Sequence, residues 1–537
     1  MSKKNHQGNS GLTKSAHLKL IVCGLMLAGV TLACSIGVLT PADPIFTPPI
    51  GVVEAAALPA VETAENPDPP APTPESETSI KVSEPIIQAP VIEPTPQPSN
   101  SSPLLYYTQA GDTLPVVAIR FGVEPEEITS PELLTGTGLL QPNQLLVIPH
   151  RLANTTSSQK IMADSEFVFS PSAAYFDIEA FVNQAGGYLS TYQEWLGSTE
   201  WTSGADIIKR VALENSINPR LLLSLLEYQS GWVYGQPANF LSEDYPLEQV
   251  DLRKKGLYAQ LVWAVNQLSI GYYGWREGYL TDIRFSDGAT ARLAPDLNAG
   301  SAGLQYYFSQ MTDSAGWVKA VDTEQGLPAL HERMFGSSWI RALDYEPLYP
   351  PDLTQPRLIL PFLIGQLWSF SGGPHGAWER DGAWAALDFA PASTQPGCVD
   401  SNAWVLAAAP GLVVRTGNAV VVLDLDGDGF EQTGWVLLYL HVSDQVVNVG
   451  DWVEMGDMLG HPSCEGGIAT GTHIHLARKY NGEWITADGP LPFNLSGWVA
   501  HSNGILYQGS LTRDGSTILA SVVGTFESRI LREREEP

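Results

Sequence analysis

Basic residues are scarce in this chain. It has 29 Lys and Arg against 58 Asp and Glu, which gives a formal net charge of −29 over 537 residues. A protein that binds nucleic acid needs clustered cations to neutralise phosphate, so this deficit argues against a nucleic-acid partner. The length exceeds what one hydrophobic core normally serves, and we therefore expect several domains.

Cysteine is also rare, with four residues in all. Cys23 and Cys34 lie in an apolar run near the N-terminus, which leaves Cys398 and Cys464 as a single pair. In an oxidising compartment this pair predicts a disulfide. Two unpaired core thiols are the alternative.

The N-terminus has the pattern of an export segment, predicted over residues 1–40. Four lysines precede an apolar run of 20 residues from Leu20 to Leu39. A basic stretch before an apolar one is typical of export signals, and this run is also long enough to span a bilayer. A retained membrane anchor, a cleaved secretory signal and a lipidated Cys34 all remain open. Each places the rest of the chain outside the cytoplasm, anchored to the membrane or secreted.

Residues 41–103 hold 16 of the 40 prolines and one aromatic residue, Phe46. Such a segment cannot bury enough apolar surface to offset its conformational entropy. We predict a disordered, semi-extended linker between the export segment and the first domain.

Residues 104–150 predict a strand, two short helices and a closing strand. The helices are expected after Asp112 or Thr113 and near Pro125, and the last strand over 145–148. The turn "GDTL", the segment "RFGV" and the ending "LQPNQLLVIP" resemble a lysin-motif (LysM) domain. This resemblance implies a small α+β domain that binds glycans containing N-acetylglucosamine.

A polar linker is predicted over residues 151–164, and residues 165–350 after it show helical periodicity. One helix is expected to begin at Pro219, with Asn218 as its cap. Other helices are expected over 206–215, 259–268 and 301–311. The segment "LLLSLLEYQSGW" resembles the active-site helix of lysozyme-like lytic transglycosylases, in which a catalytic Glu precedes Ser-Gly. Here that position is Gln229, which cannot act as a general acid. Glu227 points elsewhere, about 200° around the helix. We predict a lysozyme-like helical domain that does not cleave glycans.

Residues 351–512 alternate short apolar runs with turn signals, which predicts an all-β domain. The runs are Trp404–Leu406, Gly411–Arg415, Ala419–Leu423, Trp435–Leu440 and Ile474–Lys479.

Five of the ten histidines fall between residues 375 and 475 in this β domain. His375 follows Gly-Gly-Pro, thirteen residues before Asp388, and His441 ends the strand "LLYLH". His473 and His475 are alternate residues of one strand, so both side chains point to the same face. Imidazole and carboxylate groups suit Zn²⁺, and three protein ligands leave a fourth position for water. The sequence contains no H-E-x-x-H helix, so a glutamate base of that type is excluded.

The loop "GGPH", the strand "LDFAP" and the "HIH" pair, in this order, resemble lysostaphin-type zinc peptidases, in particular their β-lytic, staphylolysin-like branch. The resemblance covers about residues 362–507. It implies an antiparallel all-β catalytic domain with His375, Asp388 and His475 as zinc ligands. His441 and His473 would orient the water or stabilise the oxyanion. The substrates implied are the peptide stems of peptidoglycan.

His461 and the acidic segment 424–429 lie close in sequence to the predicted site. His461 is close to the site in sequence, and we do not expect it to bind metal. Residues 424–429, "DLDGDG", match the first half of an EF-hand loop, but position twelve is Trp435 and strands flank it. A hairpin turn is the favoured interpretation, with a calcium loop as the alternative. Residues 513–537 are predicted to be a tail.

The sequence thus predicts a zinc-dependent endopeptidase that hydrolyses peptide bonds in bacterial peptidoglycan and is targeted by a LysM domain. The alternative is a catalytically inactive wall-binding regulator or scaffold for other peptidoglycan hydrolases. Neither the bond cleaved nor the role of the helical domain follows from the sequence.

Overall fold

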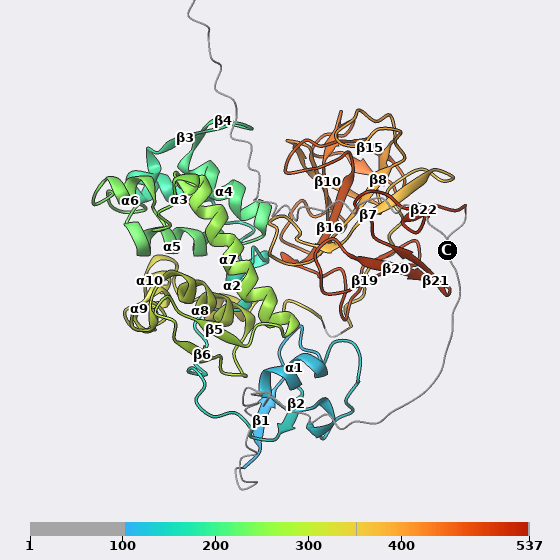
Figure 1. Ribbon diagram of the computed structural model, residues 1–537. Coiled ribbons are helices and arrows are strands. Elements are labelled where there is room, and N and C mark those ends of the chain that lie inside the picture. The colour runs from blue at the N-terminus through green and yellow to red at the C-terminus, as the bar shows by residue number, and fades with distance from the viewer. Residues whose placement is uncertain (1–101, 351, 535–537) are drawn as a thin grey trace, which may run out of the picture. The chain divides into compact units, whose positions relative to one another are not determined.

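The computed structural model describes residues 102–350 and 352–534 (Figure 1). The predicted export segment 1–40 and nearly all of the linker 41–103 lie outside the described residues. Within the described ranges, no helix combines the length and apolar character needed to cross a membrane.

The first ordered unit consists of β1 (Leu104–Tyr107), α1 (Leu114–Phe121), the 3₁₀ helix η1 (Pro125–Glu127) and β2 (Leu145–Ile148). The two strands pair antiparallel. The Thr113 side chain caps α1, and Gly122 ends it with φ +66°, a conformation that glycine adopts without strain. The predicted order of elements is observed, but the second helix is a single 3₁₀ turn.

Residues 160–350 are mainly helical. The helices are α2 (Asp164–Phe167), α3 (Ile178–Ala185), α4 (Gly204–Asn215), α5 (Pro219–Ser230), α6 (Phe240–Asp244), α7 (Leu257–Glu277), α8 (Ala299–Met311), α9 (Ser314–Ala320), α10 (Leu327–Phe335) and α11 (Ser338–Ala342). Three 3₁₀ helices and two hairpins connect them: η2 (Pro171–Ala173), η3 (Tyr188–Ser190), η4 (Leu252–Lys254), β3–β4 (Gln193–Leu196, Glu200–Ser203) and β5–β6 (Asp282–Arg284, Thr290–Arg292).

Local sequence explains the central helices of this region. The Asn218 side chain accepts a hydrogen bond from the Arg220 amide and Pro219 takes the first position, so α5 begins where the sequence predicts. The long helix α7 packs against α8 (Figure 1). A Cβ on Gly271 would lie 2.9 Å from Gly303 Cα, so the two helices require glycine at their crossing.

Residues 352–534 form an antiparallel β domain, shown in orange and red in Figure 1. Its strands are β7 (Leu367–His375), β8 (Ala386–Pro391), β9 (Val405–Leu406), β10 (Gly411–Gly417), β11 (Val420–Asp424), β12 (Trp435–Leu440), β13 (Val442–Ser443), β14 (Trp452–Val453), β15 (Met458–Pro462), β16 (Ile474–Tyr480), β17 (Glu483–Trp484), β18 (Asn494–Leu495), β19 (Trp498–Ser502), β20 (Gly509–Arg513), β21 (Ser516–Leu519) and β22 (Arg529–Leu531).

The main sheet has the order β14-β10-β11-β12-β16-β8-β7-β22, with β17 added beside β16. Two smaller sheets follow the orders β13-β15-β9 and β18-β19-β20-β21. All five strands that the sequence predicts are present within one or two residues. The prediction of an antiparallel all-β domain is confirmed.

Both faces of the central strands are buried. Val421 and Leu423 of β11 belong to the core of the β domain, whereas Val420 and Val422 pack in the core that the helical region forms. Because successive strand residues point to opposite faces, burial on both sides accounts for the unbroken apolar run "VVVL".

The sequence separates residues 513–537 as a tail, but within the described residues up to 534 this segment takes part in the β domain. β21 pairs with β20, and β22 pairs with β7 through Arg529, Ile530 and Leu531. Ile530 is buried, so apolar packing holds this edge strand in place. The tail prediction is corrected here: the fold continues to Leu531.

A buried ion-pair cluster around Arg276, at the end of α7, connects the regions of the chain. Its Nε lies 2.9 Å from Glu483 Oε1 of β17, and its Nη2 lies 3.0 Å from Asp164 Oδ2 of α2. Arg276 Nη1 donates to the carbonyl of Ala110, in the turn before α1. One guanidinium thus contacts the first unit, the helical region and the β domain.

Arg276→Ala is expected to lower the free energy of unfolding by about 3–5 kcal/mol, because it leaves two buried carboxylates without their cation. Chemical denaturation of the full chain measures the change. Arg253→Ala is the matched control: its pair with Asp251 at 2.8 Å is exposed and screened by solvent, so its loss should change the free energy of unfolding far less. Equal effects of the two substitutions would contradict a stabilising role for the buried cluster.

Candidate metal centre

Three neighbouring strands carry the predicted ligands. His375 ends β7, Asp388 lies in β8, and His475 lies in β16, with β8 between the other two. In the register of the sheet Asp388 is opposite both His475 and Gly372. A Cβ on Gly372 would overlap the Asp388 carboxylate, so glycine at this position leaves room for it. Irregular pairing near the end of β7 displaces His375 toward the same point.

The donor atoms of these side chains converge. His375 Nε2 lies 3.0 Å from His475 Nδ1, and each of these nitrogens lies 3.2 Å from Asp388 Oδ1. Ligand atoms bound tetrahedrally to zinc at about 2.0–2.1 Å are about 3.3 Å from one another. The spacing of the three atoms therefore matches a tetrahedral zinc site with its fourth position open.

The electrostatics of this cluster favour a cation. All three side chains are buried, and Asp388 Oδ1 accepts no well-formed hydrogen bond in the described residues. Burial alone would raise the pKa of the Asp388 carboxyl, but the imidazoles of His375 and His473 more than offset this and hold it well below its usual range. An ionised, buried and unpartnered carboxylate oxygen is the expected state of a metal ligand.

Backbone carbonyls orient both histidine ligands. His375 Nδ1 lies 2.8 Å from the Gly373 carbonyl oxygen, and His475 Nε2 lies 3.0 Å from that of Ala377. A carbonyl oxygen only accepts, so each of these nitrogens carries the proton and the other nitrogen keeps its lone pair toward Asp388. Such outer contacts are typical of histidine ligands.

His441 and His473 form a second pair beside the first three residues. His441 follows β12, His473 precedes β16, and their ring centroids are 4.4 Å apart. His473 Nε2 lies 3.8 Å from Asp388 Oδ1. Burial, together with the neighbouring His473 and His475, lowers the pKa of His441 to about 3. His441 is therefore a neutral imidazole near pH 7, able to accept a proton.

Sequence reasoning missed Tyr507, which lies beside this cluster. Its ring stacks on His375 with centroids 4.3 Å apart, and 38% of the residue is exposed. The Tyr507 carbonyl accepts from the Gly373 amide at 2.9 Å, which ties its loop to the end of β7. Tyr507 lies in a loop, where no alternating strand pattern predicts the direction of a side chain, so the sequence gives no signal that it is near the histidines.

Three further predictions concern the cysteine pair, His461 and the loop over residues 424–429. Cys398 and Cys464 form the predicted disulfide. His461 stands outside the cluster, with Nδ1 2.7 Å from the Ala403 carbonyl oxygen and its ring on Trp404. Residues 424–429 lie in the β11–β12 hairpin, as the favoured interpretation predicts. The Asp424 carboxylate there accepts hydrogen bonds from backbone amides of its own loop.

Comparison with known proteins identifies relatives of two regions. Residues 160–350 match the family model "LasA, N-terminal domain", and residues 394–487 match "Peptidase family M23". Protease LasA of Pseudomonas aeruginosa is 28% identical over 343 residues, which cover 61% of this chain and 75% of LasA. The β-lytic metalloendopeptidase of Achromobacter lyticus is 26% identical over 163 residues, 29% of this chain and 41% of that protein.

Among solved structures, the M23 metalloprotease pseudoalterin from the deep sea has 25% identity and a TM-score of 0.27, covering 32% of this chain and 96% of its own. The family and sequence matches confirm the prediction of a metallopeptidase related to the β-lytic enzymes. The M23 match begins after His375 and Asp388, so the placement of these two residues in the site rests on the geometry above.

Proposed function

We propose that this chain, whose C-terminal domain is a metallopeptidase domain of family M23, is a zinc-dependent endopeptidase that hydrolyses peptide bonds in bacterial peptidoglycan. The observation that carries the proposal is the convergence of His375 Nε2, His475 Nδ1 and the unpartnered Asp388 Oδ1 at the spacing of zinc ligands. These residues would hold the ion.

When bound, zinc would lower the pKa of a coordinated water from its value in bulk solvent to about 7 and would polarise the scissile carbonyl. The protein supplies the remaining groups. His441 donates through Nδ1 to the Glu465 carbonyl at 2.6 Å, which leaves its Nε2 to accept a proton from the attacking water. His473 Nε2 lies 3.8 Å from Asp388 Oδ1, and this nitrogen would orient the water; once protonated, it would donate to the oxyanion of the tetrahedral intermediate.

The substrate assignment is supported by relatives and by the first unit of the chain. Proteins named as protease LasA and β-lytic metalloendopeptidase are similar in sequence to this chain. The LysM-like sequence of residues 104–150 would add affinity for N-acetylglucosamine-containing glycan, and the export segment would place the enzyme in the cell envelope. An inactive regulator is the weaker proposal, because all five predicted site residues are present and gathered in one place.

The helical region does not supply a glycosidase in this proposal. Gln229 Oε1 accepts from the Tyr307 hydroxyl at 2.8 Å, and its Nε2 donates to the Leu247 carbonyl at 3.3 Å. Glu227 Oε2 accepts from the amides of Val233 and Tyr234 at 2.9 and 3.0 Å. The one carboxylate on this part of α5 thus stabilises the turn after the helix.

Incubation of the full chain with purified peptidoglycan is expected to release new amino termini and no new reducing or anhydro-sugar ends. Mass spectrometry of the soluble fragments identifies both, and a parallel digest with a zinc chelator should yield neither. New sugar ends would show that the helical region is a glycosidase. Intact peptide stems in the metal-loaded digest would reject the proposed substrate.

A further inference from the structure

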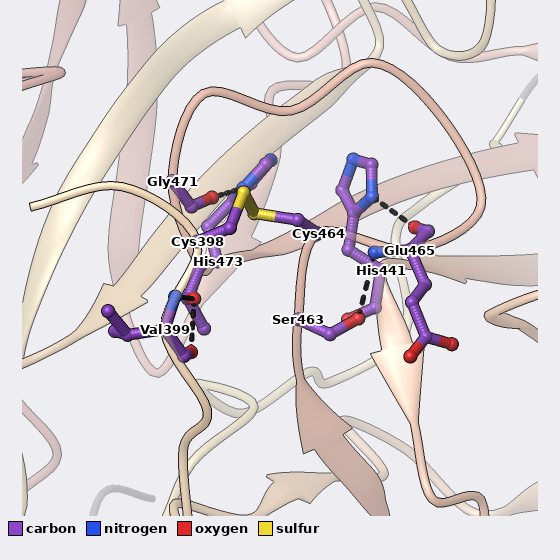
Figure 2. The surroundings of a disulfide bond; sticks show 9 residues. Cys398, Val399, His441, Ser463, Cys464, Glu465, Gly471 and His473 are labelled. Atoms are coloured by element: carbon purple, nitrogen blue, oxygen red, sulfur yellow. Dashed lines mark hydrogen bonds between the residues drawn. A yellow bond between two sulfur atoms is a disulfide. The ribbon is translucent and has the colours of Figure 1, made fainter. Parts of the chain in front are cut away.

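The disulfide between Cys398 and Cys464 joins two loops that flank the histidine pair (Figure 2). One loop precedes β9, and the other runs over residues 463–472 between β15 and β16. Next to the disulfide, the Val399 amide donates to Thr472 Oγ1 at 2.9 Å, and the same hydroxyl donates to the Val399 carbonyl at 2.5 Å.

The second loop provides the carbonyl groups that orient both histidines. Glu465, directly after Cys464, accepts through its carbonyl oxygen from His441 Nδ1 at 2.6 Å. Gly471, directly before Thr472, accepts from His473 Nδ1 at 2.8 Å (Figure 2). The disulfide at Cys464 and the hydrogen bonds at Thr472 thus each lie one residue from a carbonyl group that orients one imidazole.

Between these two ends the loop packs on the rest of the domain through the backbone of Gly466, close to Asn418 and Ala419, and its side chains are largely exposed. Residues 465–468 are exposed, including Ile468 at 91%, and two of them are glycines. Exposed segments with few apolar contacts open locally at small free-energy cost. The covalent bond and the Thr472 hydroxyl therefore add to the contacts of Gly466 and to the hydrogen bond from the Thr472 amide to the Gly397 carbonyl in holding the two carbonyl groups in place.

We propose that the Cys398–Cys464 disulfide is a positioning element for catalysis. The disulfide holds the loop that contains Glu465 and Gly471. The carbonyl groups of these two residues accept the Nδ1 protons of His441 and His473, so the Nε2 lone pair of each imidazole points at the reacting water. The proposal rests on the catalytic role assigned to these histidines. It predicts that the disulfide affects kcat without affecting zinc retention, because the carbonyl groups that orient His375 and His475 belong to Gly373 and Ala377 in another segment.

The test is the Cys398→Ser/Cys464→Ser double variant of the full chain, assayed on a soluble peptide that the parent enzyme cleaves. We expect bound zinc to stay at one equivalent, KM to change by less than about threefold, and kcat to fall by about 10–100-fold, the size of effect that misplacement by about 1 Å produces. Thr472→Val should lower kcat in the same direction, and Thr472→Ser, which keeps the hydroxyl, should restore it.

A double-mutant cycle separates positioning from general stability. In a His441→Ala background, removing the disulfide should cost clearly less than in the parent, because one of its targets is already absent. Equal costs in both backgrounds, loss of zinc from the double variant, or unchanged kcat would each overturn the proposal.

A readout that needs no substrate distinguishes this proposal from the proposed function. Imidazole ¹⁵N resonances of His441 and His473 in the zinc-loaded protein should report one tautomer, protonated at Nδ1, when the disulfide is present, and a mixture when it is absent. A single tautomer in both forms would refute the positioning role. Failure of the parent enzyme to cleave peptidoglycan would refute the proposed function instead.

Discussion

His475→Ala is expected to abolish both zinc binding and peptidase activity. His475 Nδ1 is one of the three donor atoms, 3.0 Å from His375 Nε2 and 3.2 Å from Asp388 Oδ1. Loss of a partner that merely orients a ligand already costs about 10–100-fold in metal affinity or activity, so loss of a ligand should cost more.

Zinc content after dialysis, together with turnover on peptidoglycan, measures this effect. His501→Ala is the matched control, because His501 lies on β19 in the same domain, is not one of the three converging ligands, and hydrogen bonds to Thr512 Oγ1 at 2.7 Å. That variant should keep its zinc and its activity. One equivalent of zinc retained by His475→Ala would remove His475 from the ligand set.

His441→Ala is expected to keep the metal and lose rate. The residue lies outside the three converging donors, with its ring centroid 6.3 Å from that of His475. Its low pKa keeps the imidazole neutral, so the Nε2 lone pair is free to accept a hydrogen bond from the water, and removal of one group that stabilises a transition state costs about 10²–10³ in kcat, roughly 2.7–4 kcal/mol. Because the interaction forms mainly in the transition state, kcat should fall more than substrate affinity.

Zinc analysis and steady-state kinetics of His441→Ala distinguish three roles. Retained zinc with a large loss of kcat supports the assigned role. Lost zinc would make His441 a ligand, and turnover near that of the parent would make it a structural residue at the end of a strand; either result contradicts the assignment.

Local patterns in the sequence predicted much of the fold. Asn218 and Pro219 predicted the start of α5, and apolar runs predicted five strands of the β domain to within one or two residues. Caps and strand periodicity depend on neighbours in the chain, so they can be read from the sequence. The LysM-like and lysozyme-like assignments remain predictions.

Long-range relations escaped the sequence analysis. The strand period predicted that His473 and His475 share a face. The order of strands in the main sheet could not be predicted in this way: β8 pairs between β7 and β16 and so brings Asp388 to both histidine ligands. Tyr507 reaches His375 from a loop 132 residues later in the chain. The strand in the predicted tail, β22, was missed because an edge strand of three residues has too short a pattern.

The most direct test of the account is a metal titration of the full-length enzyme. Zinc is removed with a chelator, the chelator is dialysed away, and turnover on peptidoglycan is measured as zinc is added back. We predict no turnover in the metal-free protein and a linear rise that ends at one equivalent of zinc. Undiminished turnover in the metal-free protein would contradict the zinc site formed by His375, Asp388 and His475.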